Sequence, residues 1–119
     1  MRHIEDGIQI SCVTWFGLQY PKLALLLHHS PNGGKRSASE AGRFKRMGTR
    51  PGFPDLLLLI PSGEFHGLLI ELKTEQRGSK QTDNQKAYQE IAVKYGYKYV
   101  VCRSFEQFQD IIREYLLDL

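Results

Sequence analysis

The chain has 119 residues and a formal net charge of +3, and 41% of its residues are hydrophobic. This length predicts a single domain, residues 1–119, because it supports one core but not two. No apolar stretch reaches the length of a membrane span, and the first six residues lack the apolar region of a signal peptide. We therefore expect a cytoplasmic protein that does not contact a membrane, and its compact build is compatible with a bacterial or virus-infected cell.

The first segment is predicted to be an amphipathic helix, because its large apolar side chains recur at helical spacing. They are Ile4, Ile8, Cys12, Trp15 and Phe16. Pro21 ends this helix, and the apolar run over residues 23–28 predicts a short buried strand, although a helical turn fits it too. Cys12 and Cys102 both fall on apparent core faces and lack the spacing of a metal site. We expect two buried free thiols.

A basic helix is predicted next. Ser37 and Glu40 have the spacing of a capping box, which indicates a helix from about Ser39 to Met47 with Phe44 and Met47 packed inward. Gly48 would end it as a C-cap glycine. Residues 35–50 carry six basic residues against one acid. A solvated basic helix is one interpretation, and contact with a phosphate backbone is the other.

A β-hairpin is predicted after the prolines and glycine of residues 49–54, which form a constrained loop. Two β-rich runs, residues 55–60 and 67–73, flank a segment of turn-forming residues around Gly63. A turn centred on Gly63 places Asp55 directly opposite Glu71, with Cβ atoms about 5 Å apart on one side of the sheet. Lys73 lies on that same side by strand alternation.

The C-terminal part predicts a helix, a strand and a helix. A capping box from Thr82 to Gln85 opens a helix that runs to about Tyr95 and ends at Gly96. Its predicted core stripe is Tyr88, Ile91, Ala92 and Tyr95. Residues 98–102 form the last strand, and Ser104 caps the final helix. The helix between the last two strands favours a parallel pair, so the fold class is α/β with a mixed sheet of about four strands flanked by helices.

The cluster of Asp55, Glu71 and Lys73 is the strongest chemical signal in the chain. Two carboxylates held this close repel each other unless a cation lies between them. Their hard oxygens suit Mg²⁺ or Mn²⁺, and a nearby lysine can orient an attacking water. Taken singly, the same residues also fit an ordinary surface ion pair and a turn aspartate.

Pro54-Asp55 followed by Glu71-Leu72-Lys73 resembles the PD-(D/E)xK nuclease signature of the restriction-endonuclease-like superfamily. More of the chain is similar to one branch of it, the VRR-NUC nuclease domains. The shared pattern is a Glu with a Gln four residues later, Pro-Asn-Gly-Gly, Gly-x-x-Pro-Gly-x-Pro-Asp, Glu-Leu-Lys and a helix-opening Gln. In this chain these are Glu5 and Gln9, residues 31–34, residues 48–55, residues 71–73, and Gln85. The chain departs from the pattern at Tyr88, where a Trp is more usual, and this does not affect the site residues.

The resemblance implies a restriction-endonuclease-like fold and a Mg²⁺- or Mn²⁺-dependent DNA endonuclease. Asp55, Glu71 and the Leu72 carbonyl would hold the metal, Lys73 would position or activate the water, and Gln85 and Glu5 would assist. It also implies a homodimer that prefers branched DNA, such as four-way Holliday junctions. A catalytically inactive nucleic-acid-binding module is the alternative, and RNA is a second possible substrate. The sequence does not determine the number of metal ions, the DNA sequence preference or the biological pathway.

Two further groups of residues could contact nucleic acid. The glycine-rich turn at residues 31–34 leaves room for a phosphate to approach the backbone. For His28 and His29 we favour a structural or DNA-contacting role over metal binding. The residues predicted to bind nucleic acid are Asn32, Lys35, Arg36, Arg43, Lys45, Arg46 and Arg50.

Overall fold

The structure is a computed structural model that describes residues 2–31, 37–73, 80–117 and 119. Its elements are α1 (Arg2–Gln19), the 3₁₀ helix η1 (Pro21–Leu26), β1 (Leu27–His29), α2 (Ala38–Arg46), β2 (Leu56–Leu58), β3 (Leu68–Leu72), α3 (Asp83–Lys94), β4 (Lys98–Cys102) and α4 (Phe105–Tyr115). The strands form one sheet in the order β1-β2-β3-β4. The first two pairs are antiparallel and β3 pairs parallel with β4, so the predicted mixed sheet is confirmed.

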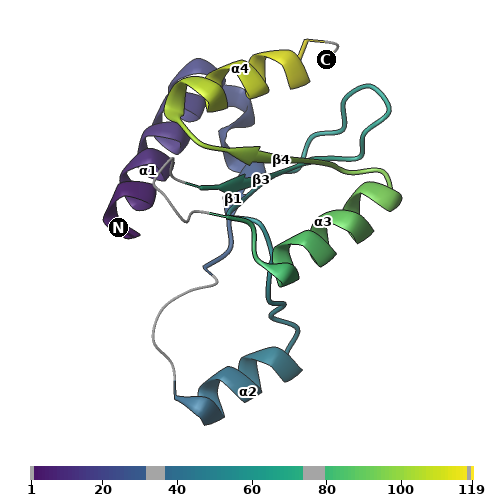
Figure 1. Ribbon diagram of the computed structural model, residues 1–119. Coiled ribbons are helices and arrows are strands. Elements are labelled where there is room, and N and C mark those ends of the chain that lie inside the picture. The colour runs from purple at the N-terminus through teal and green to yellow at the C-terminus, as the bar shows by residue number, and fades with distance from the viewer. Residues whose placement is uncertain (1, 32–36, 74–79, 118) are drawn as a thin grey trace.

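Helices cover both faces of the sheet, with α1 and α4 on one side and α3 on the other (Figure 1). The central strand β3 is therefore buried along its whole length. Its side chains alternate between the two sides. Leu68, Ile70 and Leu72 join the main core, whereas Leu69 packs against Ala92 of α3. By the same alternation Glu71 points to the α3 side.

The main core lies between the sheet and the two helices α1 and α4. Phe16 of α1 and Phe108 and Ile112 of α4 are buried there against β2 and β3. Cys12 and Cys102 are free thiols within this core, as predicted. Burial of these aromatic and aliphatic side chains supplies the main drive that holds the two helices on the sheet.

The hairpin of β2 and β3 has the predicted register. Leu56 pairs with Ile70 and Leu58 with Leu68. Asp55 and Glu71 are the next residues along the two strands, just beyond the last pair of this ladder. Between the strands, Ser62 and Phe65 form a bridge around a tight turn in which Gly63 has a φ of +58°.

The helix α2 stands apart from the sheet, at the foot of the molecule in Figure 1. Its predicted capping box is present, and Gly48 follows it with a φ of +110°. None of its residues is buried. The prediction that Met47 packs inward is wrong, since this side chain is 72% exposed. Because α2 stands apart from the sheet in Figure 1, its apolar face has no core to pack against among the described residues.

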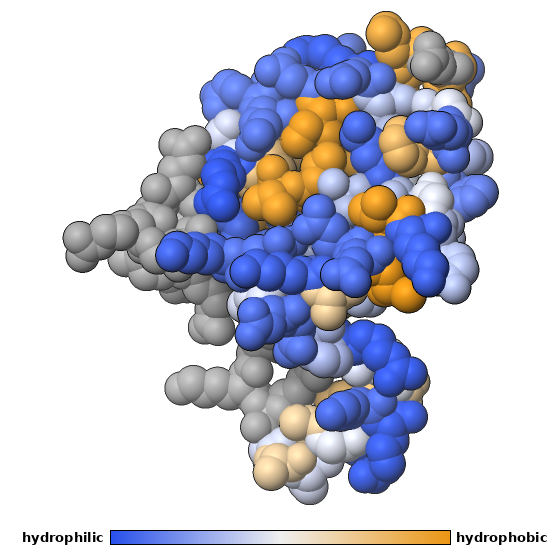
Figure 2. All heavy atoms as spheres, turned by 45° about the vertical axis from the view of Figure 1, so that its right-hand side comes forward, coloured by the Kyte–Doolittle hydropathy of each residue, from blue (hydrophilic) through white to orange (hydrophobic). Residues whose placement is uncertain are grey.

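Two other expectations need correction. A strand was predicted over residues 23–28, with a helical turn as the alternative. Residues 23–26 belong to the helix η1, and the strand covers only residues 27–29. In α3, Ile91 and Tyr95 are 51% and 63% exposed, and only Ala92 is buried. Ile91 and Tyr95 instead line an open apolar groove, and apolar side chains are visible on this side of the molecule (Figure 2).

Candidate active site

Asp55 is held between two strands at the point where β2 begins. Its carboxylate oxygen Oδ2 accepts a hydrogen bond from the Leu72 backbone N–H at 2.7 Å. Its own backbone carbonyl accepts one from His29 Nδ1 at 2.8 Å. The backbone pairing of β2 with β3 ends at Ile70, so no β2 carbonyl accepts from the Leu72 N–H. The Asp55 carboxylate accepts this hydrogen bond instead.

The side chain of Glu71 is completely buried, although it carries an ionisable carboxyl group. Its oxygen Oε1 accepts hydrogen bonds from the Tyr99 hydroxyl at 2.6 Å and from Gln81 Nε2 at 3.1 Å. Its oxygen Oε2 lies 3.8 Å from the Lys73 ammonium and has no hydrogen-bond partner among the residues that the structure describes. A buried carboxylate oxygen that accepts no hydrogen bond is unusual, because an unsatisfied buried polar atom is costly.

The environment disfavours negative charge on Asp55. Burial raises the pKa of the Asp55 carboxyl above its usual range, the Leu72 N–H lowers it in part, and the negative charges of Glu5 and Glu71 raise it further. Two other acidic side chains thus disfavour the charged form of Asp55. Burial and the hydrogen bond to Glu71 also raise the pKa of Tyr99, which keeps its hydroxyl protonated and able to donate.

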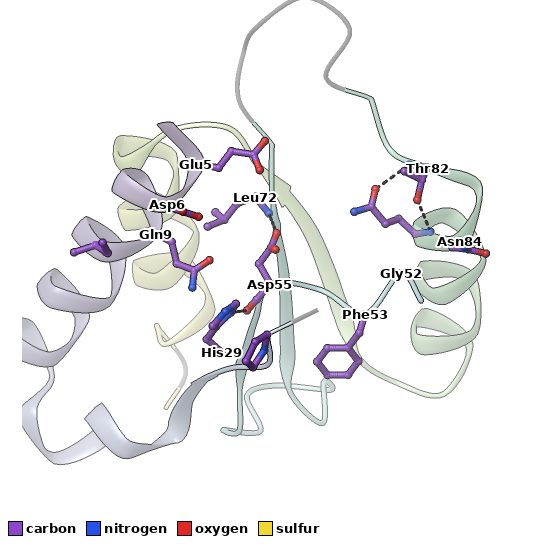
Figure 3. A pocket seen from close by; sticks show the side chains of 13 residues that line it. Glu5, Asp6, Gln9, His29, Gly52, Phe53, Asp55, Leu72, Thr82 and Asn84 are labelled. Carbon is purple, nitrogen blue, oxygen red and sulfur yellow. Dashed lines mark hydrogen bonds between the residues drawn. The ribbon is translucent and has the colours of Figure 1, made fainter. Parts of the chain in front are cut away.

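A cavity of about 850 Å³ opens between the start of α1, the end of β3 and the start of α3 (Figure 3). It brings together Glu5, Asp55, Leu72 and Gln85, four of the residues predicted to act in catalysis or metal binding. Gln9 of α1 also lines it. Figure 3 shows Glu5 beside Leu72, above Asp55. Among the described residues Glu71 and Lys73 do not line the cavity, although Glu71 neighbours Leu72 on β3.

Gln85 caps α3 at the edge of this cavity. Its Oε1 accepts a hydrogen bond from the Thr82 N–H at 2.8 Å, and its own N–H donates to Thr82 Oγ1 at 3.1 Å (Figure 3). The predicted capping box is therefore confirmed. Gly52 brings the loop before Asp55 against this first turn: with a φ of +82°, it leaves no room for a Cβ beside the Asn84 carbonyl.

The oxygen atoms present suit a hard divalent cation. The residues that the structure describes contain no group of three or more His, Cys, Asp or Glu side chains able to hold a metal. Mg²⁺ needs only one or two carboxylates and completes its shell with waters and phosphate oxygens. The N–H and C=O of one strand residue point to the same side. The Leu72 carbonyl therefore faces the Asp55 side, and Asp55, Glu71 and this carbonyl fit Mg²⁺ or Mn²⁺.

The predicted nucleic-acid-binding residues lie on or near α2, where the structure describes them. Arg43, Lys45 and Arg46 occupy its last turn. Lys45 and Arg50 line a second cavity of about 390 Å³ that reaches Asn84 of α3. Asn32, Lys35 and Arg36, together with the glycine turn of residues 31–34 from position 32 onward, lie outside the described residues.

Two residues that contact Glu71 were missed in the sequence. Tyr99 lies in the predicted last strand, and a buried tyrosine hydroxyl needs a partner, so this residue carried a usable signal. Gln81 carried none, because it lies in a polar segment without periodicity.

The mixed sheet with helices on both faces and acidic groups at one end fits a restriction-endonuclease-like α/β fold. A family model described as "VRR-NUC domain" matches residues 5–106. A solved structure described as "VRR_NUC domain protein" is 36% identical, with a TM-score of 0.83 over 96% of this chain and 88% of that chain. The chain belongs to the VRR-NUC domain family. A search of curated proteins finds no match.

Family membership gives a nuclease-type domain with DNA as its partner, in a class that generally requires a divalent metal. Of the helices that the structure describes, none combines the length and apolar character needed to cross a membrane.

Proposed function

We propose that this protein is a Mg²⁺- or Mn²⁺-dependent endodeoxyribonuclease that hydrolyses phosphodiester bonds. The observation that carries the proposal is the Asp55 carboxylate, which accepts from the Leu72 N–H at 2.7 Å, beside a buried Glu71 whose Oε2 lies 3.8 Å from Lys73 Nζ. A surface ion pair would not need a carboxylate that is 0% exposed.

The metal would be held by Asp55, Glu71 and the Leu72 carbonyl. The bound cation would neutralise charge on the scissile phosphate and favour formation of the hydroxide nucleophile. Glu71 offers Oε2, since Oε1 is already engaged with Tyr99 and Gln81. Asp55 keeps one oxygen on the Leu72 N–H, so its other oxygen is the one available to the cation.

The remaining site residues act directly on the water and the substrate. The Lys73 ammonium donates hydrogen bonds, so it holds the attacking water or stabilises charge on the phosphate oxygens. Gln85 and Glu5 assist from the cavity wall. The side-chain oxygen Oε1 of Gln85 accepts from the Thr82 N–H. The side-chain NH₂ group of Gln85 is then available to a phosphate at the N-terminus of α3.

The basic residues of α2 would contact the DNA backbone. Arg43, Lys45, Arg46 and Arg50, together with Asn32, Lys35 and Arg36, form the predicted set. An exposed helix that stands apart from the sheet can follow a phosphate backbone without disturbing the core.

The substrate would be branched DNA, such as a four-way junction, and the enzyme a homodimer. A single site cuts one strand, whereas paired cuts need two sites, which a two-fold symmetric dimer supplies. Sedimentation at micromolar concentration, with and without junction DNA, tests this part. A monomer under both conditions contradicts the dimer.

Cleavage of a substrate panel tests the activity. Single-stranded, duplex, flap and four-way-junction DNA are each incubated with Mg²⁺, Mn²⁺ or EDTA, with an RNA duplex as a further substrate. Lys73→Ala should reduce the rate roughly 10²–10³-fold, and Lys94→Ala, at the far end of α3, should not. Tight DNA binding without cleavage in either metal contradicts the enzyme and favours the inactive binding module.

A further inference from the structure

The two hydrogen bonds to Glu71 both fall on the same oxygen. Tyr99 of β4 and Gln81, which precedes α3, each donate to Oε1, at 2.6 and 3.1 Å. Oε2 receives no hydrogen bond from the described residues and lies nearest to Lys73. The carboxylate is thus held asymmetrically, with one oxygen engaged and the other available.

This asymmetry restricts rotation of the carboxylate. The last torsion of a glutamate has broad, roughly two-fold minima, so the carboxylate plane of an unrestrained side chain varies widely. Two donors that converge on one oxygen from different elements oppose rotation of this plane, because an intermediate angle would break both hydrogen bonds. Hydrogen bonds to an ionised acceptor are also stronger than neutral ones.

Gln81 is itself held in orientation. Its Nε2 donates to Glu71 Oε1 and also to Gln89 Oε1 of α3, at 2.8 Å. An NH₂ group has two hydrogens, so both are used. The amide therefore links Glu71 on β3 to α3, the helix whose first turn lines the cavity.

From this arrangement we infer that Tyr99 and Gln81 are positioning residues: they hold Glu71 Oε1 so that Oε2 is presented to Lys73 and to a divalent cation. The inference rests on the proposed metal-dependent function and deepens it. Neither residue touches the substrate in this role.

Direct Mn²⁺ binding without DNA tests the inference, measured by the electron paramagnetic resonance of unbound Mn²⁺ and by titration calorimetry. Tyr99→Phe removes only the hydroxyl and should weaken Mn²⁺ binding roughly ten-fold, within the range found when partners of metal ligands are changed. Tyr115→Phe is the matched control, because its hydroxyl is likewise buried and donates to the Ile60 carbonyl at 2.6 Å on the other side of the sheet.

Both phenylalanine variants lose a buried hydrogen bond, so both should melt at a lower temperature, but only Tyr99→Phe should change the Mn²⁺ dissociation constant. In cleavage assays Tyr99→Phe should raise the Mn²⁺ concentration that gives half-maximal rate more than it lowers the rate at saturation. Gln81→Met, in a segment outside the core, keeps the test available if Tyr99→Phe does not fold, and should weaken Mn²⁺ binding several-fold.

These measurements distinguish failure of the positioning role from failure of the proposed nuclease function. If the wild type cleaves DNA with metal but Tyr99→Phe and Gln81→Met bind Mn²⁺ as Tyr115→Phe does, the positioning role is refuted and the nuclease stands. If the wild type neither binds Mn²⁺ nor cleaves any substrate, the proposed function fails and the positioning role fails with it.

Discussion

Replacement of Gly52 by alanine should disrupt the site more than the core. Gly52 has a φ of +82°, and an added Cβ would overlap the Asn84 carbonyl and lie 2.8 Å from the Gln85 nitrogen. The methyl group must push the loop before Asp55 away from the first turn of α3. Asp55 and Gln85, which both line the cavity, would then separate.

Gly48 is the matched control for this variant. It also has a positive φ, +110°, but an added Cβ would meet nothing within 4 Å. Both alanine variants carry backbone strain of about 1–3 kcal/mol, offset in part by a stiffer unfolded chain. Gly52→Ala adds an overpacking cost of about 1–3 kcal/mol. At roughly 4 °C per kcal/mol for a chain of this size, Gly52→Ala should melt about 4–12 °C below Gly48→Ala.

Thermal denaturation followed by circular dichroism measures the first part of this prediction, and single-turnover cleavage at a temperature where both variants are folded measures the second. Gly52→Ala should lose most of its cleavage rate, whereas Gly48→Ala should keep it. Equal melting temperatures for the two variants, or an active Gly52→Ala protein, would refute the claim that close packing of this loop on α3 sets the site.

Three other outcomes are expected. Burial, assisted by the nearby Cys102 thiol, raises the pKa of Cys12 to about 12, and burial raises the pKa of Cys102. Ellman's reagent at pH 8 should therefore leave the native protein unlabelled and label both thiols in guanidinium, and rapid labelling of the native protein would contradict their burial. Changing Arg43 and Arg46 together to Gln should reduce the slope of log binding constant against log salt by about one for each phosphate that the variant no longer neutralises, and an unchanged slope would mean that α2 does not touch the backbone. The raised pKa of Asp55 means that its charged form destabilises the folded state at neutral pH. Asp55→Asn should therefore raise the melting temperature in EDTA while abolishing cleavage, and a lower melting temperature would contradict the repulsion inferred for this site.

Features that depend on neighbouring residues were predictable from the sequence. The capping boxes at Ser37 and Thr82 are local patterns, and both are present. The register of the β2–β3 hairpin also followed from a local feature, a short turn-forming segment between two β-rich runs. In such a hairpin the position of the turn determines the register of the strands.

Features that depend on distant packing were not predictable in the same way. The exposure of Met47 and Tyr95 depends on whether another element covers them, and the apolar spacing of a helix does not say whether one does. Glu5 illustrates the same limit at the site. Its helical face was readable, but its place on the cavity wall depends on how α1 crosses the end of the sheet, so only the family resemblance singled it out.

The site combines features that act against folding with others that offset them. A buried Glu71 and a charged Asp55 near Glu5 carry unfavourable electrostatic energy. The chain compensates with donors aimed at particular oxygens: the Leu72 N–H on Asp55, and Tyr99 with Gln81 on Glu71. An apolar replacement at either acidic position would remove the repulsion altogether, so stability alone does not explain why carboxylates are present. The arrangement is explained if a cation neutralises the charges that the donors leave uncompensated, because the donors then serve to leave one oxygen of each carboxylate available to it.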